Sequence, residues 1–164
     1  GITIDLNADT VSGSWADNDS IEDFEGASGS HTGDDKMLGT SGANILRGYG
    51  GDDRLYGRSG ADKLYGGDGK DYFDGGGGSG TDLLYGGDDA DTFHFDRGEG
   101  VDIVKDFENN IDTIELDNFN LTKTQALALA DQVGDDVVFD FGADGRLTIE
   151  DATIAQMSND LDMV

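Results

Sequence analysis

The feature that most restricts the fold of this sequence is a run of nine-residue repeats that begins at His31. The repeats read HTGDDKMLG, TSGANILRG, YGGDDRLYG, RSGADKLYG and GDGKDYFDG, then an eleven-residue version, GGGSGTDLLYG, and finally GDDADTFHF. Position 5 is Asp or Asn and position 7 is Met, Leu or Phe in every repeat, while position 9 is glycine in all but the last. One frame kept at three positions indicates a solenoid, in which each repeat adds the same structural unit to its neighbour.

Each repeat divides into a six-residue turn and a three-residue strand. Glycine supplies the positive φ angles that tight turns require, and the position-7 side chain points inward from its strand. Two repeats complete one coil, so that residues two repeats apart stack: we expect Asn44 above Asp62, and Asp53 above Asp71. The predicted fold is an all-β, right-handed parallel β-roll, a solenoid of nonapeptide repeats, with a small mixed C-terminal cap made of a short helix and a β-hairpin.

The flanking segments lack this regularity, and they divide the chain into three parts. Residues 1–30 are interpreted as the N-terminal edge of the roll, because alternating apolar residues at their start indicate a strand. Residues 31–104 form the roll itself. Residues 105–164, where glycine becomes sparse, are interpreted as the cap. A solenoid needs such a cap because its last coil otherwise exposes apolar side chains and unpaired strand edges.

Two elements are predicted within the cap. Thr124 is expected to begin a short helix that runs to Val133 and ends at Gly134. Residues 137–141 and 146–150 are expected to pair as a β-hairpin, because they flank a turn sequence that contains two glycines.

The turns offer the kind of ligands that calcium prefers. Their glycines allow backbone carbonyl oxygens to converge, and the acidic residue at position 5 adds a carboxylate. Calcium takes 6–8 oxygen ligands at roughly 2.3–2.6 Å, whereas magnesium demands a stricter octahedron and gives up its waters reluctantly. Zinc prefers nitrogen and sulfur ligands, and the chain offers only His31 and His94, far apart in the pattern. The sequence therefore predicts several calcium ions as cofactors.

Folding of the roll is expected to depend on this calcium. The chain has 36 Asp and Glu against 10 Lys and Arg, a net charge of −26, and like charges oppose compaction. One apolar side chain per strand cannot offset an ordering entropy of roughly 1–2 kcal/mol per residue in so many glycines. Metal binding and folding should therefore be coupled. A flexible acidic linker is the alternative that composition alone allows, and the regular pattern favours the folded roll.

The repeats resemble those of the RTX family of secreted bacterial proteins, and the resemblance covers roughly residues 31–104. It extends less specifically through Asp91-Thr92-Phe93-His94-Phe95 and Asp102-Ile103-Val104-Lys105-Asp106-Phe107. Similar in character are the C-terminal regions of serralysin-type proteases, RTX lipases and mannuronan epimerases. In the family, the carbonyls at positions 1 and 3 and the side chain at position 5 bind calcium. The residues so implied are Asp35, Thr40, Gly42, Asn44, Tyr49, Gly51, Asp53, Arg58, Gly60, Asp62, Gly67, Gly69, Asp71, Gly78, Gly80, Asp82, Gly87, Asp89, Asp91 and Asp102.

The chain departs from the family pattern at four places. Asn44 is neutral, which should weaken its site. Asp89 replaces the glycine at position 3, where its carbonyl can still serve. An insertion at residues 76–79 interrupts the frame of the neighbouring site. The first repeat, with Asp35, is expected to be incomplete because it lies at the edge of the roll.

The resemblance also implies a route of export. Family members leave the cell by type I secretion, guided by an uncleaved C-terminal signal, and Asp160-Leu161-Asp162-Met163-Val164 resembles that signal; a frayed terminus is the alternative. The chain is expected to be part of a longer, secreted or surface-located bacterial protein. It would fold outside the cell and stabilise an upstream domain of the same polypeptide, with the secretion machinery as a further partner.

Other functions find less support in the sequence. The negative charge argues against nucleic acids and anionic membranes as partners. No catalytic motif is present, and the repeat accounts for the Asp-Asp pairs, so the chain is expected to be non-catalytic. His31 and His94 are interpreted as incidental repeat positions. The alternative is a calcium-dependent adhesin or polysaccharide-binding module, with a stripe formed by Tyr49, Tyr56, Tyr65 and Tyr85.

Overall fold

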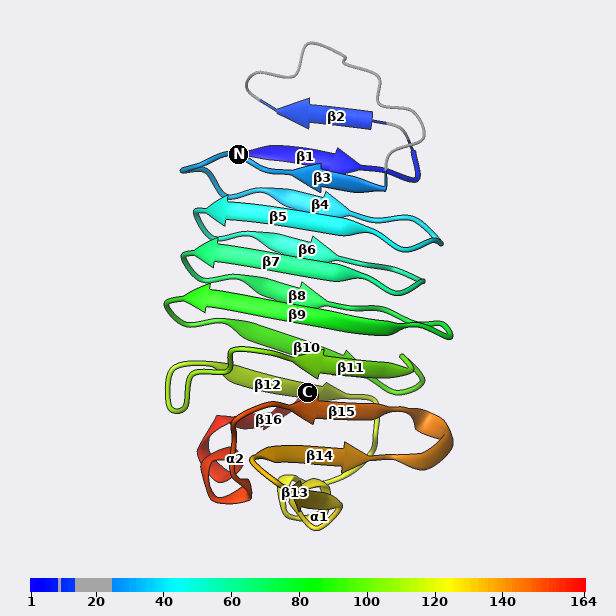
Figure 1. The fold of residues 1–164 in the computed structure, drawn as a ribbon, viewed down its shortest axis with the longest axis vertical. Helices are drawn as coiled ribbons and strands as arrows, with labels where there is room; N and C mark the ends of the chain where they lie inside the picture. Colours follow the sequence, from blue (N-terminus) through cyan, green and yellow to red (C-terminus); the bar gives the residue numbers. More distant parts are fainter. Residues whose placement is uncertain (9, 14–24) are drawn as a thin grey trace.

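The structure, a computed structural model, describes residues 1–8, 10–13 and 25–164. Within these residues the strands form two eight-stranded sheets that lie face to face along one axis (Figure 1). The chain passes from one sheet to the other after nearly every strand of the repeats, so that each coil contributes one strand to each sheet. The predicted β-roll with a mixed cap is therefore confirmed. Part of the predicted N-terminal edge, residues 14–24, lies outside the described residues.

Sheet 1 has the order β16 (Leu161–Met163), β12 (Thr113–Asp117), β10 (Thr92–Asp96), β8 (Tyr72–Asp74), β6 (Arg54–Tyr56), β4 (Lys36–Leu38), β1 (Ile2–Asp5) and β2 (Thr10–Gly13). Sheet 2 has the order β13 (Ala130–Val133), β14 (Asp136–Asp140), β15 (Arg146–Ile149), β11 (Val101–Val104), β9 (Thr81–Asp88), β7 (Lys63–Asp68), β5 (Ile45–Gly50) and β3 (Gly26–Ser28). Neighbouring repeat strands are parallel.

The core of the roll is a double column of position-7 side chains. In sheet 2, Leu46 pairs with Leu64, which pairs with Leu84, and none of the three is more than 1% exposed. In sheet 1, Phe73 stacks on Phe93 with ring centroids 5.0 Å apart. Each coil thus buries one large apolar side chain from each sheet, as the repeat predicts. Burial of one such side chain is worth roughly 1.5–3 kcal/mol, which is little for a coil of eighteen residues.

The cap differs in detail from its prediction. Helix α1 covers only Lys123–Leu127, and Thr122, not Thr124, caps it by accepting the Gln125 N–H at 3.3 Å. The predicted continuation of this helix to Val133 is wrong, because β13 covers that segment and pairs antiparallel with β14. Gly134, with a φ of 68°, serves the β13–β14 turn. The predicted hairpin is confirmed as β14 and β15, joined by a short 3-10 turn at Gly142–Asp144.

The last elements of the chain were not predicted as structure. Helix α2 (Ile154–Asp160) begins at Thr153, whose N–H donates to Gln156 Oε1 at 2.6 Å. Strand β16 follows directly and pairs in parallel with β12. Met157 and Leu161 are fully buried, so this segment completes the core of the cap. No helix in the described part of the chain is long and apolar enough to cross a membrane.

Candidate calcium-binding turns

The position-5 side chains form two columns inside the roll, one for each row of turns. The first column holds Asp35, Asp53, Asp71 and Asp91, and the second holds Asn44, Asp62, Asp82 and Asp102. Each of these residues is at most 3% exposed. Carboxylates are seldom buried to this degree unless they are paired, so the partners of their oxygen atoms decide what the columns can bind.

Except in Asp102, one oxygen of each carboxylate in the two columns accepts a hydrogen bond within the fold. Asp53 Oδ1 accepts the Asp35 N–H at 2.7 Å, and Asp71 Oδ1 accepts the Asp53 N–H at 2.7 Å. In the second column, Asp62 Oδ1 accepts the Asn44 N–H at 2.7 Å. The predicted stacking of these residues, two repeats apart, is therefore confirmed. Each carboxylate reaches back by one coil and ties successive turns together.

In four of the carboxylates that use one oxygen in this way, the second oxygen has no hydrogen-bond partner. Among the described residues, Oδ2 of Asp53, Asp62, Asp71 and Asp91 is buried without a hydrogen-bond partner. A buried carboxylate is strongly unfavourable unless a cation or a hydrogen-bond donor compensates its charge. Calcium accepts carboxylate oxygens among its ligands. The donor set therefore fits this ion.

The glycine at position 9 makes room for these oxygen atoms. A Cβ atom on Gly48 would overlap Asp53 Oδ2, and a Cβ on Gly66 would overlap Asp71 Oδ2. Neither glycine has a positive φ angle. The repeat pattern predicts a role for the glycines in turn formation and carbonyl convergence, but at this position glycine is required because a carboxylate packs against its Cα atom.

Burial also changes how these carboxyl groups titrate. Burial raises the pKa of Asp53 to about 6, and the nearby Asp35 carboxylate acts in the same direction. Burial raises the pKa of Asp62 and of Asp71 to about 7, and that of Asp91 to about 8. The backbone N–H bonds lower each value only in part. Near neutral pH the columns thus hold either protons or a compensating cation.

The carbonyls at positions 1 and 3 line the same turns. Tyr49 at position 1 and Asp89 at position 3 have φ angles of 79° and 81°, a conformation uncommon for residues other than glycine. A Cβ on Gly67 would overlap the Tyr49 carbonyl oxygen, and a Cβ on Gly69 would overlap that of Gly51. The carbonyl oxygens at both positions therefore face the next coil, where stacked turns meet.

The first member of each column differs from the others. Asp35 Oδ1 accepts the Ile2 N–H at 2.7 Å, and its Oδ2 accepts the N–H of Ser30. Asn44 Oδ1 accepts the Thr40 N–H at 2.7 Å. Both side chains are satisfied by protein donors, so they have less capacity for an ion than the residues deeper in the roll.

The frame of the eleven-residue repeat differs from the predicted one. Gly76 has a φ of 81°, close to the 74° of Arg58 at position 1, and Gly78 has the same φ of 131° as Gly60 at position 3. The residues between them, Ser59 and Gly77, form a bridge. Stacking places Gly76 rather than Gly78 over position 1, because a Cβ on Gly76 would overlap the Arg58 carbonyl oxygen. A Cβ on Gly80 would overlap the Gly60 carbonyl oxygen, so Gly80 stacks as position 3, as the sequence predicts. Calcium binding by these carbonyls stays a prediction.

A denser acidic group lies beside this longer repeat. Asp102 is fully buried, and neither of its oxygens has a hydrogen-bond partner among the described residues. A Cβ on Gly75 would lie 2.9 Å from Asp102 Oδ2 and 3.0 Å from Asp82 Oδ2, so these carboxylates lie side by side. Burial and the neighbouring Asp82 raise the pKa of Asp102 well above its ordinary value, and Glu99 and Asp74 act in the same direction. The sequence analysis missed Asp74 and Glu99 because neither occupies a ligand position of the repeat.

Comparison with known proteins identifies the repeats. A family model of the RTX calcium-binding nonapeptide repeat, with four copies, matches residues 31–64, 48–81 and 77–102. Residues 31–102 are RTX calcium-binding repeats. The resemblance drawn from the sequence is thereby confirmed, and calcium is the cofactor of this family of repeats. No curated protein shows significant sequence similarity to the chain.

Two solved structures are also similar to the chain. The extracellular lipase LipA from Serratia marcescens is 15% identical, with a TM-score of 0.44 over 82% of this chain and 40% of the lipase chain. The AlgE6R3 subunit of the Azotobacter vinelandii mannuronan C5-epimerase is 28% identical, with a TM-score of 0.38 over 82% of this chain and 80% of its own. The chain thus spans less than half the length of the lipase.

Proposed function

We propose that this chain is a non-catalytic module whose RTX repeats fold when calcium ions bind between stacked turns. The observation that carries the proposal is the row of buried Oδ2 atoms without hydrogen-bond partners, which leaves negative charge inside the roll. Bound calcium would supply the compensating positive charge. The ligands would be these carboxylates together with the carbonyl oxygens at positions 1 and 3, with Gly76 and Gly80 serving in the eleven-residue repeat.

The same arrangement supports a role outside the cell. Extracellular calcium modules bind at roughly 10⁻⁴–10⁻³ M, so the roll would remain unfolded in a cytosol of low calcium and fold after export. Asp160, which the resemblance places in an export signal, is 6% exposed and accepts the Asn110 N–H at 3.0 Å, while Leu161 is fully buried. A type I secretion system could read such a signal only in the unfolded chain. Once folded, the roll would stabilise an upstream domain of the secreted protein.

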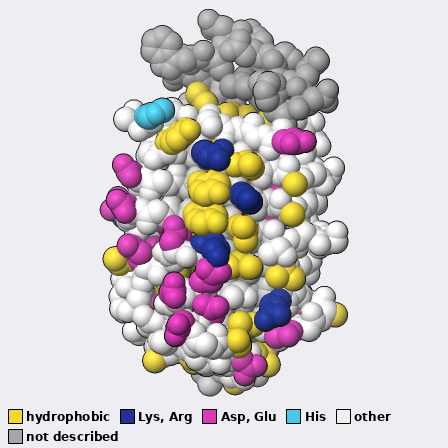
Figure 2. Space-filling view, in the orientation of Figure 1, with side chains coloured by type: hydrophobic (Ala, Val, Ile, Leu, Met, Phe, Trp, Pro, Cys, Tyr) yellow, Lys and Arg dark blue, Asp and Glu magenta, His cyan; other side chains and the backbone are white. Residues whose placement is uncertain are grey.

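A sugar-binding stripe of tyrosines is less well supported. Figure 2 shows hydrophobic, Lys and Arg side chains along the middle of one face, with acidic side chains gathered at its side. The rings of Tyr65 and Tyr85 stack at 4.6 Å, and the Arg47 guanidinium lies 5.1 Å from the Tyr65 ring centre. Tyr49 stacks on His31 at 4.8 Å. Because the flat faces of these rings cover one another, few remain for stacking on a sugar.

The test is a calcium titration of the whole chain in chelator-treated buffer, followed by far-UV circular dichroism. We expect a cooperative rise in β signal near millimolar calcium and no such rise with magnesium. A chain that has its full β signal in chelator would contradict calcium-dependent folding. An equal response to magnesium would contradict the assignment of the ion.

A further inference from the structure

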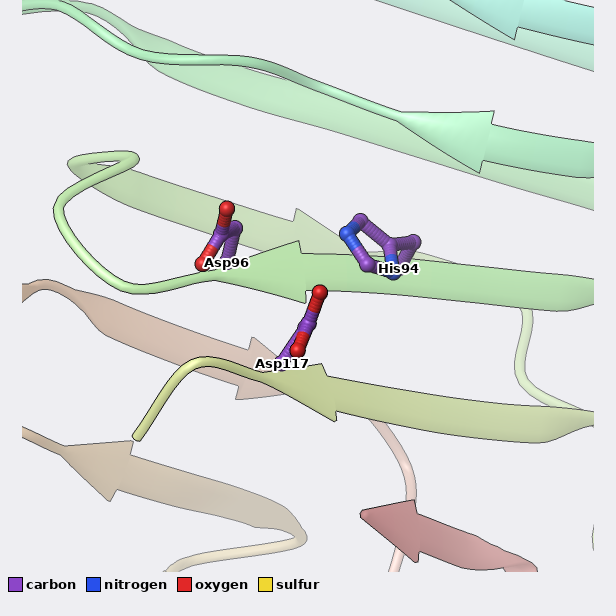
Figure 3. Close-up of side chains that lie close together, drawn as sticks. All are labelled: His94, Asp96 and Asp117. Carbon is purple, nitrogen blue, oxygen red and sulfur yellow. The ribbon is translucent and has the colours of Figure 1, made fainter. Parts of the chain in front are cut away.

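A different cluster of metal-ligating side chains lies on the outer face of sheet 1, away from the turns. His94 and Asp96 come from β10, and Asp117 comes from the adjacent strand β12 (Figure 3). One ligand atom from each lies within 4.8 Å of the other two. We propose that these three residues, with Glu115 beside them, bind a divalent transition-metal ion of the zinc class.

The strand register brings the cluster together. His94 and Asp96 are two residues apart on one strand, so their side chains share a face of the sheet. The parallel pairing of β10 with β12 sets Asp96 opposite Asp117 and His94 opposite Glu115. Glu115 Oε2 lies 3.6 Å from His94 Nδ1. Four potential ligands therefore project from two hydrogen-bonded strands, which hold their backbones at fixed spacing.

Local hydrogen bonds orient the two aspartates. Asp96 Oδ1 accepts the Arg97 N–H at 2.6 Å, and Asp117 Oδ1 accepts the Asn118 N–H at 2.6 Å. Each carboxylate keeps a second oxygen that needs no backbone donor. His94 Nδ1 is buried and lacks a hydrogen-bond partner among the described residues. A buried ring nitrogen of this kind is unfavourable unless it bonds to a donor, an acceptor or a metal ion.

The charge around the cluster is uncompensated within the described part of the chain. Three carboxylates surround one imidazole, and no Lys or Arg of the described residues forms an ion pair with Asp96, Glu115 or Asp117. The nearest arginine in sequence, Arg97, pairs with Asp144 at 3.0 Å instead. A divalent cation would remove this repulsion.

The imidazole decides which cation the site favours. Calcium takes oxygen ligands, whereas zinc is bound by His nitrogen and Asp or Glu oxygen at about 2.0–2.2 Å. Ligand atoms around a tetrahedral ion with such bonds lie roughly 3.3–3.6 Å apart, so the side chains would have to rotate to bring the three atoms closer together than they lie here. The distance between the two histidines in the repeat pattern argues against a zinc site that uses both, but this site needs only His94.

The test uses the calcium-saturated protein, so that the turns are already filled. Isothermal titration calorimetry with zinc chloride, in excess calcium, should give one zinc ion per chain. His94→Gln should weaken zinc binding at least tenfold, and Asp117→Asn should weaken it in the same direction. His31→Gln changes the other histidine, which stacks on Tyr49, and should leave zinc binding unchanged. Circular dichroism in calcium checks that each variant keeps the fold.

A second readout identifies the ligands. With cobalt in place of zinc, the visible absorption spectrum should show a bound ion with nitrogen coordination, and the signal should be lost in His94→Gln. Zinc binding that persists in His94→Gln, or that disappears equally in His31→Gln, would overturn the proposal. So would complete displacement of zinc by millimolar calcium, because the site would then be another calcium site. None of these results depends on whether calcium drives folding of the turns.

Discussion

Asp91 in the roll and Asp112 in the cap occupy successive places in one column of carboxylates, yet they are bonded differently. Asp91 Oδ1 accepts the Asp71 N–H at 2.8 Å, and its Oδ2 has no partner. Asp112 Oδ1 accepts the Asp91 N–H at 2.9 Å, and its Oδ2 accepts the Glu108 N–H at 2.8 Å. In the roll, one oxygen of Asp91 therefore remains available to a cation. In the cap, a backbone N–H satisfies the corresponding oxygen of Asp112.

The hydrophobic cores of the roll and of the cap also differ. The repeat strands mostly bury one large side chain each, while the cap gathers three aromatic rings against Phe95 of the last repeat. Phe119 and Phe141 are only 4.2 Å apart, and Phe95 and Phe139 each lie about 6 Å from Phe141. Both cap helices also have side-chain hydrogen bonds at their first turns. We therefore expect hydrophobic packing to stabilise the cap, whereas folding of the roll depends on bound calcium.

The largest expected effect therefore comes from removing calcium. In chelator, hydrogen exchange should become fast throughout the repeat strands, from β5 to β9, and remain slower in β14, β15 and α2. The reason is that, among the described residues, the buried carboxylate oxygens without a hydrogen-bond partner all lie in the roll. Mass spectrometry of exchanged peptides measures both regions in one sample. Equal loss of protection in the roll and the cap would remove the distinction between them.

The next effect is a pH dependence of the calcium-free roll. Burial raises the pKa of Asp91 to about 8 and that of Asp62 and Asp71 to about 7, against about 3.9 in an unfolded chain. Between roughly pH 4 and 8 the folded roll thus binds more protons than the unfolded chain, so its stability is greatest at acid pH and falls as the pH rises.

Circular dichroism in chelator, at pH values from about 4.5 to 8, tests this dependence. The β signal should be highest at the acid end and decrease through neutrality, and added calcium should flatten the curve. A signal that is constant with pH in chelator would contradict the link between carboxylate burial and folding.

The glycine at position 9 allows the packing around one buried carboxylate of the roll to be tested. Gly48→Ala would drive a Cβ into Asp53 Oδ2 and to within 2.9 Å of the Gly66 carbonyl oxygen, and overpacking of this kind costs about 1–3 kcal/mol. Gly42→Ala is the matched control, because its Cβ would meet nothing closer than Thr40 Oγ1 at 3.8 Å. The melting temperature in calcium should fall for the first variant and stay nearly constant for the second. Equal shifts would contradict the role assigned to position 9.

The repeat frame explains why so much of the roll could be predicted. An apolar residue such as Leu64 recurs at position 7, and an acidic residue such as Asp62 recurs at position 5. This periodicity sets both the core and the carboxylate columns. The eleven-residue repeat could not be aligned in this way, because the stacking of Gly76 on Arg58 and of Gly80 on Gly60 is a property of the folded coils. The zinc-class cluster was missed for a related reason: Asp117 meets Asp96 through the register of β12 on β10, and no repeat spans the segment between them.

The cap was harder to predict because its elements are short and depend on distant partners. Residues Ala130–Val133 have apolar positions that fit a helix, but they pair with β14 instead. The last residues were interpreted as a signal, and that interpretation left α2 and β16 without a predicted structure. Strand β16 forms only because β12 offers it a free edge, which the local sequence does not encode.

Replacing one carboxylate in each region tests the comparison directly. Asp71→Asn should keep an oxygen for the Asp53 N–H while it removes the charge, so calcium affinity should fall about tenfold, or ~1.4 kcal/mol, with little loss of stability in chelator. Asp112→Asn should instead lose one of two backbone hydrogen bonds, at a cost of about 1–3 kcal/mol, with or without calcium. Calorimetric calcium titrations and thermal melts of both variants separate the two outcomes. Identical behaviour of the Asp71 and Asp112 variants would refute the contrast between the carboxylates of the roll and of the cap.

The smallest effect is expected at the N-terminal edge of the roll, where a single arginine links distant coils. The Arg58 guanidinium forms two hydrogen bonds to the Asp5 carboxylate, at 2.8 and 3.0 Å, and donates to the Gly39 carbonyl at 2.7 Å. The pair is partly exposed, so its contribution should be about 0–1 kcal/mol. Arg58 also has a φ of 74°, which costs of order 1 kcal/mol for a residue with a Cβ atom.

These two contributions can be separated at Arg58 with two variants. Arg58→Ala loses the pair with Asp5 but keeps the unfavourable φ, so thermal melts in calcium should show a small destabilisation. Arg58→Gly loses the same pair but relaxes the backbone, and its melting temperature should equal or exceed that of the original chain. Because both variants lose the same side chain, the difference between their melting temperatures reports the backbone alone. If Arg58→Gly were the less stable of the two, the turn would not be strained at this position.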